Sequence, residues 1–347
     1  GSGSSSSSDR SFTRLPQETQ ARIAAFLLGV ELLALSHVNS AALQTFSQEH
    51  LWKSRLAVDT TILSSFQTSS KRNYLRECQS FSFPGTSRQS ESGRGFVPVC
   101  ATMRDAFGSW GRPFSFETWF SISSGGDPEA PASTASGVLL GAQAVRLKND
   151  ALPSSPQEEP SSYAQLVFID VQRNLFCSVI NCSTQDSAPV ALALESNRWY
   201  HLALVYNSDT EAVYLNGELV SSVRGSLDRK WRSLYAAQVG VGYLGSGSVS
   251  SERRSGWYDF HGVVDSFRVH RFALSVASIR QLAAGQEERE DAELEEPTFC
   301  LKRDFRQIHS RAPQRVRCSR PQERWCQVGR MPTLDAEGSL DTLLDSI

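Results

Sequence analysis

The amino-acid sequence predicts an α+β protein with more than one domain, in which a small helical domain precedes an antiparallel β-sandwich. The first observation is that apolar residues recur at helical spacing over residues 15–56. The second is a change to strict alternation near Ser80, which is typical of strands with one buried face. The third is that many short strand-like segments, separated by turn signals, follow this point, and few segments there have helical spacing. This pattern favours a sandwich.

These patterns divide the chain of 347 residues into five parts. The Gly/Ser-rich start is expected to be disordered. The charged end combines an acidic run at 286–296 with a basic run at 301–330, and such runs are usually solvated. We therefore expect disorder at 1–10, a helical domain at 11–60, a linker helix at 61–79, the sandwich at 80–285 and a charged, mostly disordered tail at 286–347.

The helical domain begins at Pro16, whose fixed φ and missing N–H suit the first turn of a helix. Ile23, Phe26 and Leu27 follow at i, i+3 and i+4, which places them on one stripe, and Gly29 ends this helix. A unit this small is marginally stable alone. Some of its apolar side chains are therefore expected to contact a partner or the next domain.

This region resembles an F-box in the order of its motifs, which are Leu15-Pro16-x-Glu18, Ile23, Phe26-Leu27, Leu32-Leu33-x-Leu35-Ser36-x-Val38-Asn39 and Leu51-Trp52-Lys53-x-Arg55-Leu56. The resemblance implies docking on the Skp adaptor of an SCF-type cullin–RING ubiquitin ligase. It also implies which residues face that adaptor, namely Leu15, Pro16, Ile23, Leu27, Leu32, Leu35 and Val38. The alternative is a three-helix packing unit with a chance Leu-Pro start.

The linker helix is expected to begin at Ser69 or Ser70 and to carry Tyr74, Leu75 and Cys78. It would join the two domains, and a rigid connection matters for a receptor that must hold its substrate in a fixed orientation.

Strand signals then follow one another along the sandwich. Residues 114–122 alternate over nine positions, with Phe114, Phe116, Thr118, Phe120 and Ile122 on one face and Glu117 and Trp119 on the other. Further strands are expected at 163–171, 175–180, 199–206, 212–215, 218–220, 237–241 and 262–270. Between two of these strand segments, Asn216-Gly217 is a strong signal for a two-residue hairpin.

A second resemblance is carried by residues 114–122, Asn197-Arg198-Trp199-Tyr200-His201, Leu215-Asn216-Gly217 and Val264-Asp265-Ser266-Phe267-Arg268-Val269. In combination they are similar to a laminin-G-like, concanavalin A-like lectin/glucanase jelly roll. The resemblance spans about residues 80–285, and 274–282 is similar to the short helix that usually closes this fold.

Catalytic chemistry is not indicated. Glucanases of this superfamily use paired carboxylates in a Glu-x-Asp-x-x-Glu pattern on one strand face, but Glu117 is a lone strand acid. We therefore expect no catalytic residue, no glycoside hydrolysis and no cofactor. His201 is expected to be a packed, hydrogen-bonded histidine rather than a ligand or base.

Metal binding is not indicated either. Spacings of eight to nine residues separate Cys300, His309, Cys318 and Cys326, unlike the short paired spacing of zinc fingers. Asp265 has two interpretations, a calcium ligand or an acceptor of backbone N–H groups at a strand start, and we favour the second.

Composition limits the partners and the compartment. A formal net charge of -2 selects neither nucleic acid nor an anionic membrane. The sequence has no apolar run of spanning length and no signal-peptide pattern at its start, and its seven Cys fit a reducing compartment. We therefore expect a cytoplasmic or nuclear protein, or one found in both.

The function expected from the two resemblances is that of a non-catalytic ligase adaptor, whose sandwich binds a protein or glycan substrate. Its partners would be the Skp adaptor and the cullin–RING subunits. The alternative is a carbohydrate-binding or structural module without a ligase role.

Overall fold

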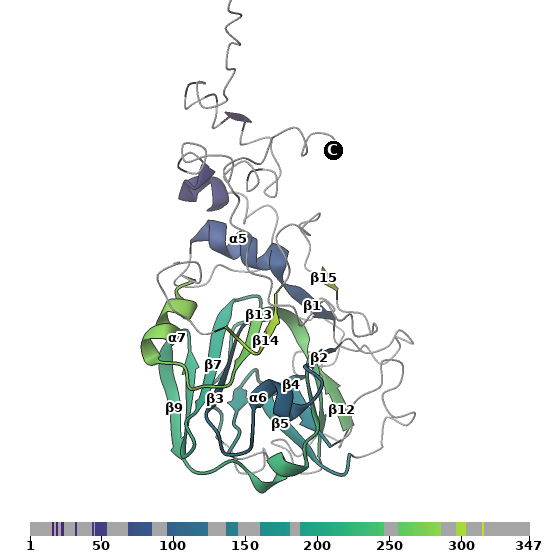
Figure 1. The fold of residues 1–347 in the computed structure, drawn as a ribbon. Coiled ribbons are helices and arrows are strands. Elements are labelled where there is room, and N and C mark those ends of the chain that lie inside the picture. Colours follow the sequence, from purple (N-terminus) through teal and green to yellow (C-terminus); the bar gives the residue numbers. More distant parts are fainter. Residues whose placement is uncertain are drawn as a thin grey trace, which may run out of the picture.

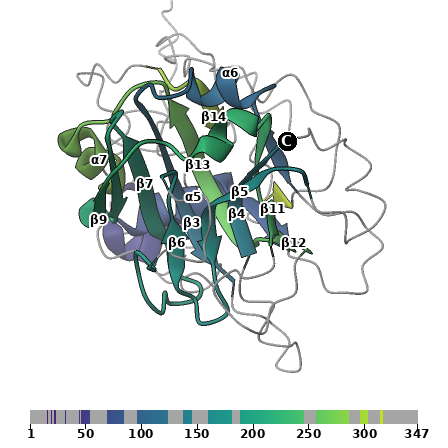
Figure 2. The same cartoon turned by 90° about the horizontal axis from the view of Figure 1, so that it is seen from below.

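The computed structural model shows a sandwich of two β-sheets with few helices (Figure 1). Figure 2 shows the two sheets side by side, with β7, β3 and β13 on one side and β5, β4 and β12 on the other. The structure describes residues 16, 19, 22–23, 32, 44, 46–53, 69–84, 96–123, 137–144, 160–180, 188–245, 256–285, 296–302 and 314–315.

The first sheet has the strand order β15-β1-β13-β3-β7-β8-β9, and β14 also pairs with β13. Apart from the parallel pair β1–β15, neighbouring strands run antiparallel. Its strands are β1 (Phe81–Pro84), β3 (Phe114–Ile122), β7 (Tyr200–Tyr206), β8 (Thr210–Leu215), β9 (Glu218–Arg224), β13 (His261–His270), β14 (Phe299–Leu301) and β15 (Gln314–Arg315).

The second sheet has the order β11-β12-β4-β10-β2, with β5 paired to β4 and β6 to β5. Its strands are β2 (Val97–Val99), β4 (Gly137–Gln143), β5 (Tyr163–Ile169), β6 (Leu175–Cys177), β10 (Ala236–Val239), β11 (Val241–Leu244) and β12 (Gly256–Asp259). The predicted strand at 237–241 is thus divided at Gly240, whose φ is 101°.

The alternation over 114–122 is confirmed as a single strand, β3, with Phe114, Phe116 and Phe120 in the main core between the sheets. Burial of such rings is the main stabilising term of a sandwich. Glu117 and Trp119 lie on the opposite face, yet both are buried as well. The outer face of this sheet is therefore covered rather than open to water.

Helices cover part of that outer face. Helix α7 (Val276–Ala283) packs Ile279 and Leu282 against Ala203 and Val205 of β7. Helix α5 (Ser70–Gln79) lies above the sandwich in Figure 1. The short helix α6 (Met103–Phe107) and the 3₁₀ helix η3 (Arg229–Ser233) were not predicted from the sequence.

The predicted hairpin at Asn216-Gly217 is confirmed. Both residues have positive φ, 54° and 85°, and Leu215 pairs with Glu218 across the turn. This is the geometry that a two-residue type I′ turn requires.

The sandwich extends past the boundary at 285 that the sequence suggested. Strand β14 pairs Phe299 with Val269 and Leu301 with Phe267, and both Phe299 and Leu301 are buried. Strand β15 pairs with β1. The expectation of a mostly disordered tail was therefore wrong for these residues, because charge composition dominated the prediction and three strand residues are too few to change it.

Candidate functional site at the junction of helix α5 and the sandwich

Helix α5 has two different contact surfaces, one for each part of the chain that it joins. Residues four apart lie on the same side of a helix. Ser70 and Tyr74 contact the segment 46–53, whereas Arg72 and Arg76 contact the sandwich side. The predicted linker helix is therefore present at 70–79, and it bridges two structures that are distant in sequence.

The first surface holds the helical segment that begins at Glu49. The backbone N–H of Ser70 donates to Glu49 Oε1 at 2.9 Å, and Lys71 Nζ donates to Ser47 Oγ at 3.1 Å. The rings of Trp52 and Tyr74 lie 5.3 Å apart at 56°, and both side chains are buried. A buried aromatic pair of this kind contributes about 0.5–1.5 kcal/mol beyond the burial of its surface, and it joins the two helical segments.

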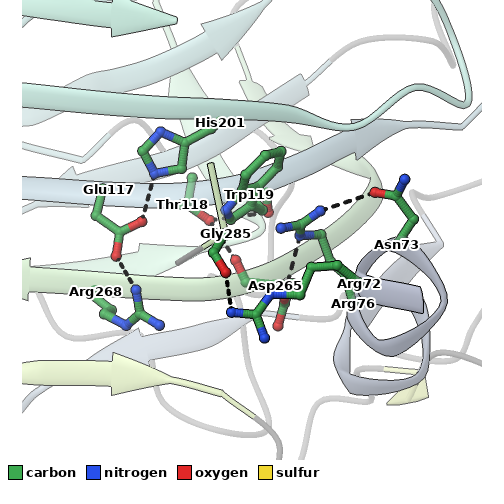
Figure 3. A network of polar contacts seen from close by, with 10 residues as sticks. All are labelled: Arg72, Asn73, Arg76, Glu117, Thr118, Trp119, His201, Asp265, Arg268 and Gly285. Atoms are coloured by element: carbon green, nitrogen blue, oxygen red, sulfur yellow. Dashed lines mark hydrogen bonds and ion pairs between the residues drawn. The ribbon is translucent and has the colours of Figure 1, made fainter. Parts of the chain in front are cut away.

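The second surface is centred on Arg76, which is buried against the outer face of the first sheet (Figure 3). Its guanidinium carbon lies 3.5 Å from the centroid of the Trp119 ring and 5.8 Å from that of Trp199. Its Nε lies 3.7 Å from Asp265 Oδ2, and its Nη1 donates to Asn73 Oδ1 at 3.2 Å. A stacked, buried guanidinium fixes both the position and the angle of the helix.

Arg72 adds a contact to the end of helix α7. Its Nη2 donates to the carbonyl oxygen of Gly285 (Figure 3). Helix α5 is therefore connected to β3 and β13 through Arg76 and to the end of α7 through Arg72.

A second polar cluster lies beside Trp119 on the same sheet face. Glu117 accepts from Arg268 Nη1 at 2.7 Å and contacts His201 Nε2 at 3.0 Å (Figure 3). Because an ionised carboxylate only accepts hydrogen bonds, Nε2 carries the proton of this contact. Glu117 and His201 are both fully buried, so His201 is a packed, hydrogen-bonded residue as predicted.

His270 and Cys300 lie close to this cluster. Burial lowers the pKa of His270 from 6.5 to about 4, while Glu117 opposes this shift and Arg268 adds to it. Burial also raises the pKa of the Cys300 thiol. Cys300 stands opposite Arg268 in the β13–β14 pair, so its thiol is part of the sandwich.

The structure brings two carboxylates onto one sheet face, which the sequence analysis did not foresee. Asp265 is paired with Trp119 across the strands, two positions along from Glu117. It therefore lies within β13 and next to Arg76, not at a strand start as the sequence suggested. Asp265 and Glu117 each contact an arginine, Arg76 and Arg268, and such pairs balance buried charge.

The seven residues that the F-box resemblance assigned to an adaptor surface are only partly described. Pro16 is exposed and accepts from the N–H of Thr19 at 2.9 Å, Ile23 is half-buried in a helix, and Leu32 is 1% exposed. Leu32 is therefore buried within this chain, and the adaptor-facing role of these residues stays a prediction. The other four, Leu15, Leu27, Leu35 and Val38, lie outside the described residues.

Neither a metal-binding cluster nor a membrane-spanning helix occurs in the described part of the chain. Within it, no three His, Cys, Asp or Glu side chains are grouped as a metal ion would require. Of the candidate metal ligands in the tail, Cys300 lies in β14, whereas His309, Cys318 and Cys326 lie outside the described residues. No described helix is long and apolar enough to cross a membrane.

Comparison with known proteins gives a match over the sandwich. The family model described as the concanavalin A-like lectin/glucanases superfamily matches residues 101–280. No curated protein matches the sequence.

Several solved structures are similar to this chain. A heptameric SAP-like pentraxin from Limulus polyphemus has 13% identity and a TM-score of 0.35, over 60% of this chain and 82% of the pentraxin. The IT-sialidase CBM40 of Ruminococcus gnavus, bound to α2,3-sialyllactose, has 12% identity and a TM-score of 0.35, over 58% of this chain and 96% of that one. A Trypanosoma rangeli sialidase has 20% identity and a TM-score of 0.35, over 57% of this chain and 27% of the sialidase.

Proposed function

The chain belongs to the concanavalin A-like lectin/glucanase superfamily, and from this premise we propose that it is a non-catalytic substrate-recognition adaptor of an SCF-type cullin–RING ubiquitin ligase. In this role the F-box-like region 11–60 binds the Skp adaptor, and the sandwich binds a protein or glycan substrate. The role belongs to the cytoplasm or nucleus, where ligase subunits meet their substrates.

The observation that carries the proposal is the double contact of helix α5. One side of this helix holds Trp52, which belongs to the last part of the F-box-like motif. The other side holds Trp119 and Asp265 of the sandwich. An adaptor acts by positioning, because a substrate lysine must come close to a ubiquitin thioester on another subunit. A stiff connection between the two binding regions serves that purpose.

The non-catalytic part of the proposal rests on the two outer-face carboxylates. A glycosidase needs one carboxyl group to donate a proton and another to attack or to activate water at an accessible bond. Glu117 and Asp265 are instead buried and contact Arg268 and Arg76. Their arrangement favours a structural role at the junction.

The test is adaptor binding by a double variant, Leu15→Ala with Pro16→Ala. Interfaces of this kind concentrate their energy in a few apolar anchors, and truncating one costs about 2 kcal/mol or more. We therefore expect adaptor affinity to fall more than tenfold, since each 1.4 kcal/mol is about a factor of ten. The measurement is a calorimetric titration with purified Skp adaptor, beside a melting curve of the same variant.

The matched control is Leu192→Ala, because Leu192 is an exposed leucine of the sandwich. This variant should bind the adaptor like the unmodified chain. No adaptor binding by the unmodified chain, or an unchanged affinity in the double variant, contradicts the proposal. If the double variant unfolds, the milder change Leu15→Ser replaces it.

A second candidate is a carbohydrate-binding module without a ligase role, which the superfamily match favours. A glycan array with the full chain separates the two. Glycan binding without adaptor binding supports the second candidate, whereas adaptor binding supports the first.

A further inference from the structure

Exposed positive charge is concentrated where α6 meets η3. Ten Lys and Arg side chains are exposed among the residues whose exposure the structure describes. Six of them belong to α6, the turn after it, η3 and the residue that follows β13, and they are Arg104, Arg112, Arg229, Lys230, Arg232 and Arg271. Together with Trp110 they are called the basic surface below. The other four, Arg22, Lys53, Arg224 and Arg280, belong to other elements.

Contacts between these segments join them into one surface. The Phe107 ring of α6 lies 5.6 Å from the Trp231 ring of η3, edge to face. Arg271 Nη2 donates to the carbonyl oxygens of Arg104 at 3.2 Å and of Asp105 at 2.5 Å. In Figure 1, α6 lies on the lower part of the sandwich whereas α5 lies above it. The basic surface is therefore separate from the junction.

Trp110 is an exposed aromatic residue within the basic surface. Its side chain is 42% exposed, and the guanidinium carbon of Arg232 lies 4.0 Å from its ring centroid. Because residues three apart share one side of a 3₁₀ helix, Arg229 lies on the same side of η3 as Arg232. Arg112 follows Trp110 by two positions, in a turn whose Arg112 N–H donates to the carbonyl oxygen of Ser109 at 3.1 Å. Three arginines are thus grouped around one exposed indole ring.

The positive charges of the basic surface are not balanced by ion pairs. None of its six basic side chains forms an ion pair with a carboxylate of the described residues. The two acids of the same segments take part in helix caps, since Asp228 accepts from the N–H of Lys230 and Asp105 accepts from Thr102 Oγ1, each at 2.8 Å. Six positive and two negative charges leave a net charge of +4 in this place, although the whole chain has a net charge of -2.

The hydrogen-bonding groups of this surface indicate the chemistry of its partner. The side chains of Arg, Lys and Trp carry donors and no acceptors. A sugar hydroxyl both donates and accepts, so a neutral glycan fits these side chains poorly. An ionised carboxylate only accepts, and it pairs with a guanidinium group through two parallel hydrogen bonds. The partner that fits is therefore anionic.

Two properties favour an acidic protein segment over a nucleic acid. A nucleic acid is charged along its whole length, so it also meets the remainder of a chain whose net charge is -2. An acidic segment of a protein concentrates its charge over a few residues. Single strands also bind by stacking their bases on aromatic rings, whereas Arg232 already covers one face of Trp110. Recognition of acidic motifs by groups of arginines is a common mode of peptide binding.

We propose that the basic surface binds an acidic segment of a protein substrate, whose carboxylates pair with Arg229 and Arg232 and whose apolar side chains contact Trp110. The inference rests on the proposed function for the role of this partner as a ligase substrate, and it names the class of that substrate. The assay of the acidic segment contains no adaptor, and the adaptor titration contains no acidic segment. Either proposal can therefore fail while the other holds.

The experiment is a fluorescence polarisation titration of the full chain against a fluorescein-labelled peptide that repeats Glu-Glu-Ala. We expect binding that weakens as the salt concentration rises, because exposed charges are screened by salt. The double variant Arg229→Glu with Arg232→Glu replaces two attractions by two repulsions, so its affinity should fall about tenfold or more. Arg229→Lys with Arg232→Lys keeps both charges and should bind the peptide more tightly than the double reversal does.

The matched control compares two single reversals, Arg232→Glu in the basic surface and Arg280→Glu in α7, which change the net charge equally. Arg280 is exposed and lies outside the basic surface, so its reversal should weaken binding less than that of Arg232. Circular dichroism should be the same for all variants because the changed side chains are exposed.

Four results overturn the proposal. The first is that the unmodified chain does not bind the acidic peptide at low salt, and the second is that it binds a Gln-Gln-Ala peptide equally well. The third is that the double reversal leaves the affinity unchanged, or that Arg280→Glu weakens binding as much as Arg232→Glu. The fourth is tighter binding of a labelled oligothymidine of equal charge, which assigns the surface to nucleic acid instead.

Discussion

Arg76 is expected to stabilise the junction more than any exposed arginine of the sandwich. It is buried, stacks on Trp119 at 3.5 Å from the ring centroid and lies 3.7 Å from Asp265 Oδ2. The change Arg76→Met keeps most of the length and the apolar stem of this side chain. It removes the positive charge and leaves the Asp265 carboxylate buried beside an apolar group.

The size of the effect follows from these contacts. Removing one partner of a buried ion pair costs about 3–5 kcal/mol, because the other charge loses the compensation that this partner gave. A desolvated cation–π contact contributes about 2 kcal/mol. Both contacts belong to one side chain, so the two figures overlap, and we expect the free energy of unfolding to fall by about 4 kcal/mol.

The assay is urea unfolding, followed by circular dichroism and tryptophan fluorescence. With a denaturant slope of about 2–3 kcal/mol/M, the transition midpoint should fall by roughly 1.5 M. The double variant Arg76→Met with Asp265→Asn removes the carboxylate charge together with its arginine partner. It should therefore be less destabilised than the sum of its single variants by about 2 kcal/mol.

The matched control is Arg280→Met, because Arg280 contacts Glu218 at 3.8 Å and both side chains are largely exposed. An exposed pair of this kind is worth about 0–1 kcal/mol. A loss below about 1 kcal/mol for Arg76→Met, or an equal loss for Arg280→Met, would refute the reasoning.

The remaining predictions concern pH and the C-terminal strand. Because the pKa of His270 is about 4 in the folded chain and 6.5 ordinarily, the unfolded chain binds more protons between these values, and stability falls as pH drops through this window. The loss of folding free energy approaches roughly 3 kcal/mol below pH 4. His270→Phe should therefore reduce the difference between the melting temperatures at pH 7 and at pH 4.5. An unchanged difference would contradict this prediction. Leu301 is fully buried in β14, so Leu301→Ala should cost about 2–5 kcal/mol in urea unfolding, whereas the exposed Leu192→Ala should cost less than about 0.5 kcal/mol. Equal losses for the two leucines would place β14 outside the cooperative unit.

Much of the sandwich could be predicted from local sequence patterns. Alternation over 114–122 placed Phe114 and Phe116 in the core and Glu117 and Trp119 on the other face, because successive side chains of a strand point to opposite sides. The Asn216-Gly217 turn followed from the positive φ that both residues tolerate. The adaptor-facing residues were assigned by resemblance alone, and their role stays a prediction.

The junction, in contrast, was decided by tertiary structure. The sequence showed polar residues on the outer face of β3, but the cover over that face comes from α5, whose Arg76 is more than forty positions away from Trp119. The placement of Asp265 beside Arg76 depends on the register between β13 and β3, which shifts between Asp265 and Arg268. Strand β14 was missed for the same reason, since three residues carry little local signal and pair with β13 from a distant part of the chain. Local periodicity fixes which side chains share a face, whereas what packs on that face depends on contacts that form only when the whole chain folds.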